Sequence, residues 1–168
     1  MTIKVKLTGG LGNQMFQFAT GYSVARKNNL DLSLDLSWFK RRKLHNGFEL
    51  NRVFNIYSNI SFLNSPLSFK SINFKEILNK IDKTFHIFNE PYFHYTSSIS
   101  NIPKRCFLKG YWQSELYFKD FSQDIRKIFN FNKQLDKTNS LIANEINCNN
   151  SISIHIRRGD YLLKKNFD

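Results

Sequence analysis

The stretch that decides the fold is residues 3–36, IKVKLTGGLGNQMFQFATGYSVARKNNLDLSLDL. Its first residues alternate apolar and basic side chains, which is the period-two pattern of a strand. A glycine-rich loop follows, and apolar residues then recur along one side of a predicted helix that ends near residues 26–29. Leucines alternate with polar residues over 30–36 and predict a second strand. This order of strand, glycine turn, helix and strand is typical of an α/β fold.

The pattern is weaker in the remainder of the chain. Residues 37–56 contain apolar anchors without a sustained period, namely Trp38, Phe39, Phe48, Leu50, Phe54 and Ile56. Segment 58–105 predicts short strands, a helix near 73–82 and long loops. We expect further elements as follows: a strand at 107–112, helices at about 114–129 and 133–147, and a strand at 152–157.

The composition limits the class of protein. Of the 168 residues, 41% are hydrophobic and 23% are charged, which is typical of a globular protein and not of a disordered one. Cys106 and Cys148 are too few for a disulfide scaffold or a multi-cysteine zinc module, and we expect both to be buried or half-buried. No apolar run reaches the roughly 18 residues of a spanning helix. The N-terminus lacks the apolar core of a signal peptide, which favours the cytoplasm.

The net charge of the chain is +12, from 25 Lys and Arg against 13 Asp and Glu. Such an excess attracts anions, including nucleic acid, phosphorylated small molecules and an acidic membrane surface. The alternative explanation of the positive net charge is a Lys-rich, Asn-rich composition with a solvated surface. The basic residues are dispersed apart from short clusters such as Lys40–Lys43, and no nucleic-acid recognition pattern is present in the sequence. We therefore expect no nucleic-acid partner.

The first loop with candidate chemistry is GGLGNQ, residues 9–14. Gly10 and Gly12 would let the backbone approach a ligand closely, and the N-terminus of the following helix favours an anion. The loop is neither a complete dinucleotide fingerprint nor a phosphate-binding loop with a Gly-Lys-Ser/Thr ending. The alternative is a tight strand-to-helix turn in which Asn13 caps the helix.

The second loop is HIRRGDY, residues 155–161, at the end of the last predicted strand. Guanidinium groups bind phosphate oxygens in a bidentate manner and keep their charge. Arg157 and Arg158, with His155 and Asp160, would therefore suit a diphosphate group. The alternative is a solvated surface turn that contains an Arg–Asp pair.

Five blocks of sequence resemble bacterial α-1,2-fucosyltransferases, which form glycosyltransferase family 11. They occur in the family order along the whole chain. The blocks are residues 5–19 around GGLGNQMFQFA, LDLSWF at 34–39, FEL with FNI in 48–56, GYWQSE with YF in 110–118, and HIRRGDY at 155–161.

The resemblance implies an α/β fold of the GT-B type, in which two Rossmann-like domains face each other. Residues 1–150 would form the N-terminal, acceptor-side domain, and residues 151–168 would begin the domain that binds GDP-fucose. The implied reaction is inverting transfer of L-fucose from GDP-fucose to the 2-hydroxyl of a terminal galactose, with no metal or other cofactor required. The acceptor would be an oligosaccharide or lipid-linked glycan of the cell surface, such as an O-antigen or capsule. The enzyme would work in the cytoplasm, with peripheral contact to the acidic inner face of the bacterial membrane.

The resemblance also assigns roles to single residues. Catalytic roles fall to Arg158, Asp160 and Asn13. Arg158, with Arg157 beside it, would neutralise the charge of the departing diphosphate. The general base stays open between Asp160 and Glu115. Trp38, Tyr111 and Trp112 either stack on a sugar or pack in the core. The residues expected to bind the donor are His155, Arg157, Arg158, Asp160, Tyr161, Gly10, Gly12 and Asn13.

Length is where the chain departs from the family, whose members run to roughly 300 residues, or two domains. A lone first strand at 152–157 would lack parallel neighbours. We therefore expect a truncated form with weak or no activity. The alternative is an isolated glycan-binding acceptor domain without catalysis.

Overall fold

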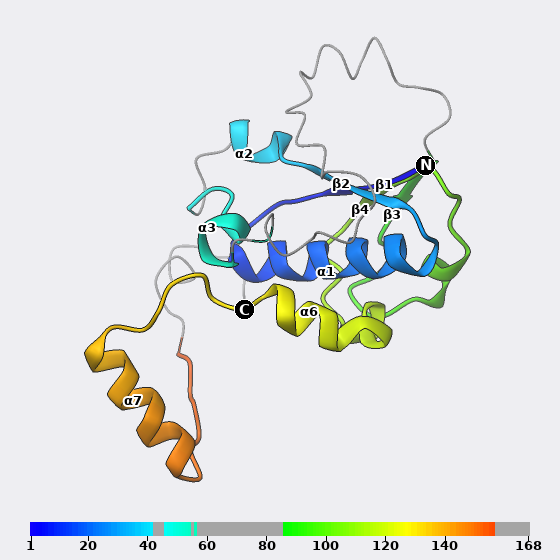
Figure 1. Cartoon of the computed structure of the whole chain (residues 1–168). Helices are drawn as coiled ribbons and strands as arrows, with labels where there is room; N and C mark the ends of the chain where they lie inside the picture. Colours follow the sequence, from blue (N-terminus) through cyan, green and yellow to red (C-terminus); the bar gives the residue numbers. More distant parts are fainter. Residues whose placement is uncertain (42–45, 55, 57–85, 157–168) are drawn as a thin grey trace. The chain divides into compact units, whose positions relative to one another are not determined.

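The computed structural model describes residues 1–41, 46–54, 56 and 86–156 (Figure 1). It divides into two compact units, Met1–Asn132 and Lys133–Asp168. The predicted helix near 73–82 lies outside the described residues. Across the described part, no helix has the length and apolar character that a bilayer span requires.

The first unit is built on a parallel sheet of four strands, in the order β2-β1-β4-β3. Val5 is in register with Leu34 on one side and with Leu108 on the other, and all three are buried. Because every strand runs the same way, the carboxyl ends of all four meet at one edge of the sheet. This confirms the predicted α/β class. The strands are β1 (Thr2–Lys6), β2 (Asp31–Asp35), β3 (His86–Asn89) and β4 (Cys106–Lys109).

Helix α1 (Leu11–Lys27) crosses from β1 to β2 and confirms the predicted strand–helix–strand opening. It ends at a cap formed by Asn28, followed by Asn29 in the left-handed conformation with φ 53°. One side of α1 lies so close to the sheet that a Cβ at Gly21 would overlap the Val5 side chain. No other residue type fits there without a shift of the sheet or the helix.

The opposite side of α1 is covered too, by the segment that carries α6 (Ser122–Ile128) (Figure 1). Aromatic pairs join the two: Phe16 with Phe118, Phe18 with Phe129, and Tyr22 with Phe121. The prediction of a helix with a single apolar side is therefore wrong. Most of α1 is buried, and its buried residues include polar ones, namely Gln14, Gln17, Thr20 and Ser23.

The apolar anchors of 37–56 pack as expected. Leu50, Phe54 and Ile56 are buried, and Phe39 and Phe48 pack against the core. The described part of this segment contains two short helices, α2 (Ser37–Arg41) and α3 (Leu50–Phe54).

The predicted strand at 107–112 is shorter in the structure. It ends at Lys109, because Gly110 turns the chain and Trp112 takes a left-handed φ of 58°. The turn is closed by a hydrogen bond from Ser114 N to the Trp112 carbonyl at 2.8 Å.

The predicted helix at 114–129 is broken into three pieces. They are the 3-10 turns η2 (Glu115–Tyr117) and η3 (Lys119–Phe121), and then α6. Aromatic packing overrides helix periodicity here, since Phe118 and Phe121 both turn toward α1. A further 3-10 helix, η1 (Ser97–Asn101), precedes β4.

The second unit contains α7 (Lys137–Cys148), close to the predicted helix at 133–147. Asp136 caps it by accepting a hydrogen bond from Asn139 N at 2.8 Å. Cys148 is exposed, which contradicts the prediction that both cysteines are buried. Residues 151–156 have no regular structure and are exposed, so the strand predicted at 152–157 is wrong for that part. Alternation alone does not form a strand, because a strand needs a hydrogen-bonded neighbour.

Two glycine-to-alanine changes in α1 have opposite expected effects. Gly21→Ala should lower the free energy of unfolding by about 1–3 kcal/mol, because the new methyl group overlaps the stiff, buried Val5 side chain. Gly12→Ala meets nothing within 4 Å and should raise it by about 0.4–1 kcal/mol. Urea denaturation of both variants measures the two effects. Equal effects of the two changes would contradict the close packing of α1 on the sheet.

The two cysteines should differ in reactivity. Burial raises the pKa of the Cys106 thiol to about 11, and its side chain is fully covered in β4. A short pulse of iodoacetamide in mildly alkaline buffer should therefore alkylate Cys148 alone, as read by peptide mass spectrometry. Alkylation of Cys106 at a similar rate in the folded protein would contradict the burial of β4, and denaturant should bring both thiols to similar rates.

Candidate functional site

Three loops of the first unit begin at the carboxyl edge of the sheet. Residues 7–10 follow β1, residues 90–96 follow β3, and residues 110–114 follow β4. In open α/β sheets this edge is where ligands bind. The predicted site residues Gly10, Gly12 and Asn13 all lie here.

Gln17 ties two of these loops together from within α1. Its side-chain oxygen accepts a hydrogen bond from Thr8 N at 2.8 Å. Its Nε2 donates to Thr8 Oγ1 and to the Gly110 carbonyl, both at 2.9 Å. The side chain is fully buried, so these bonds are shielded from water. One amide group therefore fixes the β1 loop against the β4 loop.

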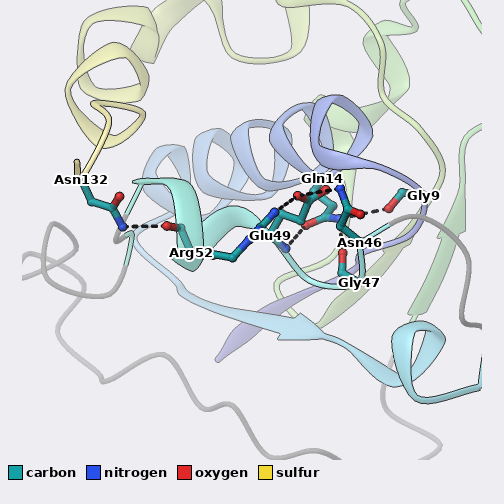
Figure 2. A network of polar contacts seen from close by, with 7 residues as sticks. All are labelled: Gly9, Gln14, Asn46, Gly47, Glu49, Arg52 and Asn132. Carbon is teal, nitrogen blue, oxygen red and sulfur yellow. Dashed lines mark hydrogen bonds and ion pairs between the residues drawn. The ribbon is translucent and has the colours of Figure 1, made fainter. Parts of the chain in front are cut away.

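Gln14, one turn earlier, connects the β1 loop to the segment before α3 (Figure 2). Its Nε2 donates to the carbonyls of Gly9 at 3.0 Å and Gly47 at 2.9 Å, and its Oε1 accepts from Glu49 N at 2.9 Å. The Glu49 carboxylate is buried and pairs with Arg52. The network thus extends from the glycine loop to α3.

Asn13 lies inside the first turn of α1 and does not cap the helix. The N-cap is Gly10, in an extended conformation and without a side-chain hydrogen bond, so the capping alternative for Asn13 is wrong. The tight turn itself is confirmed, because Gly9 adopts a φ of 75°. Asn13 Oδ1 accepts instead from Gln113 Nε2 at 2.6 Å, which joins the start of α1 to the β4 loop.

This pair leaves hydrogen-bonding capacity at the sheet edge. Within the described residues, Asn13 Nδ2 and Gln113 Oε1 have no hydrogen-bond partner, and Gln113 is exposed. A Cβ at Gly12 would meet open space, so the backbone is accessible at that position. An amide donor, an amide acceptor and an accessible backbone suit a polar ligand with hydroxyl groups.

Glu90 fixes the loop after β3 against the loop after β4. Its carboxylate accepts from Tyr111 N at 2.6 Å and from Trp112 N at 3.0 Å. Its own N–H donates to the Lys109 carbonyl at 2.8 Å and continues the ladder between the strands. Gly110 is required at this crossing because a Cβ there would overlap the Glu90 side chain.

The buried side chains of Trp112 and Tyr117 hold these loops in place. The Trp112 ring is fully buried and stacks on Phe88, with ring centroids 6.0 Å apart. Of the two alternatives for Trp112, stacking on a sugar or packing in the core, the structure therefore shows core packing. Tyr117 Oη donates to the His94 carbonyl at 3.3 Å and accepts from Thr96 N at 3.1 Å. A bulky residue at positive φ costs about 1–3 kcal/mol, so Trp112 holds the β4 loop in a strained conformation.

The other predicted site residues are not brought together by the described structure. Arg157, Arg158, Asp160 and Tyr161 lie outside the described residues. His155 is described, and it is exposed in the irregular end of the second unit. Glu115, a candidate base, is exposed on η2. Over the described ranges, no group of His, Cys, Asp and Glu side chains is arranged to hold a metal ion.

Sequence patterns did not predict the parts played by Gln14, Gln17 and Glu90. A signal for the glutamines is present, since polar residues three apart lie among the apolar residues of α1 and must find partners if buried. Glu90 carries no comparable local signal, because its partners are the backbone of residues 111 and 112, which only β3–β4 pairing brings near.

The loss of the Gln17 amide should cost stability. In Gln17→Leu, Thr8 N and the Gly110 carbonyl lose their partner, and we expect the free energy of unfolding to fall by about 1–3 kcal/mol in urea denaturation. The matched control is Gln123→Leu on the exposed side of α6, expected within about 0.5 kcal/mol of wild type. Similar values for the two variants would contradict the structural role of Gln17.

Comparison with known proteins identifies relatives of this chain. The model of the family described as "Glycosyl transferase family 11" matches residues 1–166. The chain is 35% identical over 168 residues to an "Alpha-1,2-colitosyltransferase" of Escherichia coli, covering 95% of this chain and 55% of the relative. It is 30% identical over 176 residues to the "O-antigen biosynthesis glycosyltransferase WbnK" of Escherichia coli, covering 93% of this chain and 58% of that protein. No solved structure matches.

The chain thus spans a little over half the length of these relatives. The family match covers nearly every residue, from β1 through α7 to the HIRRGDY motif. The chain belongs to glycosyl transferase family 11.

Proposed function

We propose that this protein is an α-1,2-fucosyltransferase that moves L-fucose from GDP-fucose to the 2-hydroxyl of a terminal galactose. The observation that carries the proposal is the family match over residues 1–166, which includes both the GGLGNQ loop and HIRRGDY. In this proposal the architecture is GT-B. The first unit serves the acceptor, and HIRRGDY begins the part that binds the donor.

In the proposed reaction, the 2-hydroxyl oxygen of galactose attacks C1 of fucose from the face opposite to GDP. The bond between C1 and the phosphate oxygen breaks, and GDP leaves with the electron pair, so the configuration at C1 inverts. A general base takes the proton of the attacking hydroxyl, and Asp160 and Glu115 are the two candidates. The exposed position of Glu115 on η2 supports its access to a substrate. Arg157 and Arg158 neutralise the charge that develops on the diphosphate.

A second donor sugar has a specific observation in its favour. The relative that is 35% identical is described as an α-1,2-colitosyltransferase. Colitose is fucose without the 3-hydroxyl, so a site for one sugar differs from a site for the other at a single polar contact. The relative described as an O-antigen biosynthesis enzyme supports a surface glycan as the acceptor.

A transfer assay tests the proposal. The purified protein is incubated with lactose and, in separate reactions, with GDP-fucose, GDP-colitose and UDP-galactose. Because the chain spans a little over half the length of its relatives, we expect only slow formation of a fucosylated product from GDP-fucose, with an α-1,2 linkage by NMR. Transfer from GDP-colitose alone would favour the second donor. Binding of lactose without transfer from any donor would contradict the transferase proposal and favour a glycan-binding domain.

The paired arginines should be required for transfer. Arg158→Ala should reduce kcat by about 100-fold or more, because a charge that stabilises the leaving diphosphate is lost. The charge-matched control is Lys165→Ala, in the same C-terminal stretch, which should keep wild-type kcat. A similar loss in both variants would indicate an effect of overall charge and would contradict the assignment of Arg158.

A further inference from the structure

A pocket of the first unit is not used by any step of the proposed reaction. It has a volume of about 620 Å³ and lies between the loop after β3 and the loop after β4. Five consecutive residues and two from the neighbouring loop line it, namely Glu90, Pro91, Tyr92, Phe93, His94, Gly110 and Tyr111. Its volume falls within the roughly 300–1,000 Å³ range of small-molecule sites.

The pocket presents flat aromatic rings to solvent. Phe93 is 77% exposed, Tyr92 is 62% exposed and Tyr111 is 41% exposed. The rings stack in pairs, Tyr92 on His94 with centroids 4.9 Å apart and Phe93 on Tyr111 at 6.3 Å. Gathered, exposed aromatic side chains are costly in water and typically mark a binding surface. Tyr111 is thus distinct from Trp112, its fully buried neighbour.

The loops that carry these rings are held firmly. The Glu90 carboxylate binds the backbone N–H groups of Tyr111 and Trp112, and the Tyr117 hydroxyl binds the far end of the β3 loop at His94 and Thr96. Both ends of the aromatic wall are therefore fixed before any ligand arrives. Such preorganisation lowers the entropy cost of binding.

The charges of the pocket argue against the nucleotide donor as its occupant. None of the described residues that line it is a lysine or an arginine, and its single carboxylate would repel a diphosphate. Both carboxylate oxygens of Glu90 already accept backbone hydrogen bonds. Flat apolar faces with tyrosine hydroxyls and an imidazole at their edges suit a neutral ring that has one C–H face and polar edges.

We propose that this aromatic pocket binds a neutral sugar ring of the acceptor glycan, with the C–H face of the sugar against Phe93 and Tyr111. The inference rests on the proposed function, because it takes a glycan to be the acceptor. The pocket lies on the same sheet edge as Asn13, which Gln113 connects to the β4 loop two residues after Tyr111. In this inference the pocket and the Asn13 amide contact one glycan chain, so Asn13 serves the acceptor and not the donor to which the resemblance assigns it.

The test is saturation-transfer-difference NMR on the whole chain with methyl β-galactoside and lactose. We expect saturation of the C–H protons of one sugar face. Phe93→Ala should weaken binding roughly tenfold, since it removes an aromatic contact face. Phe93→Trp should keep binding, whereas Phe93→Leu, which keeps apolar character but no flat ring, should resemble the alanine variant.

The matched control is Phe131→Ala, because Phe131 is 74% exposed and lies outside the pocket. This variant should bind like wild type. Circular dichroism of each variant verifies that it is folded, which the high exposure of both side chains leads us to expect.

The outcomes separate this inference from the proposed function. If wild type and Phe93→Ala bind lactose equally, the pocket is not the acceptor site, and the transferase proposal is unaffected. If GDP displaces lactose from wild type, the pocket belongs to the donor, and the inference is wrong. If wild type binds neither sugar, the inference is also wrong, and the transfer assay alone decides the function.

Discussion

The first unit depends on two buried amide side chains in α1, those of Gln14 and Gln17. They lie in a helix that is covered by the sheet on one side and by aromatic residues on the other. A buried amide without partners is costly, so each must meet a backbone group of fixed position. These partners are the loop after β1, the loop after β4 and the segment before α3 (Figure 2). Apolar side chains of similar size would fill the same space without fixing those loops.

These buried hydrogen bonds hold the loops at the carboxyl edge of the sheet, where ligands bind in open α/β sheets, in fixed positions. Glu90 and Tyr117 likewise fix the loop after β3, through hydrogen bonds between their side chains and backbone groups. The edge then presents an exposed amide pair and an aromatic pocket without basic residues among its described lining. The basic motif HIRRGDY lies at residues 155–161, far along the sequence from these loops. In the proposed function, the sheet edge binds the neutral acceptor and this motif binds the anionic donor.

Local patterns predicted best the elements whose environment is also local. The alternation of β1 and β2 and the glycine turn before α1 were predicted correctly, because a parallel strand–helix–strand unit is closed within 36 residues. Residues 114–129 were predicted wrongly as one helix, since their aromatic side chains pack on α1, a hundred residues earlier in the chain. The alternation at 152–156 has no neighbouring strand in the described structure. The pocket was beyond sequence reasoning, because its two loops meet only through the pairing of β3 with β4.

In the proposed function, the carboxyl edge of this sheet holds the acceptor glycan. The most direct measurement is a titration of the isotope-labelled chain with lactose, followed through the backbone amide signals in two-dimensional NMR. We expect shifts that cluster in residues 10–13, 90–94 and 110–113, with the signals of α6 and α7 unchanged. Shifts confined to residues 133–156, or spread evenly over the chain, would contradict it.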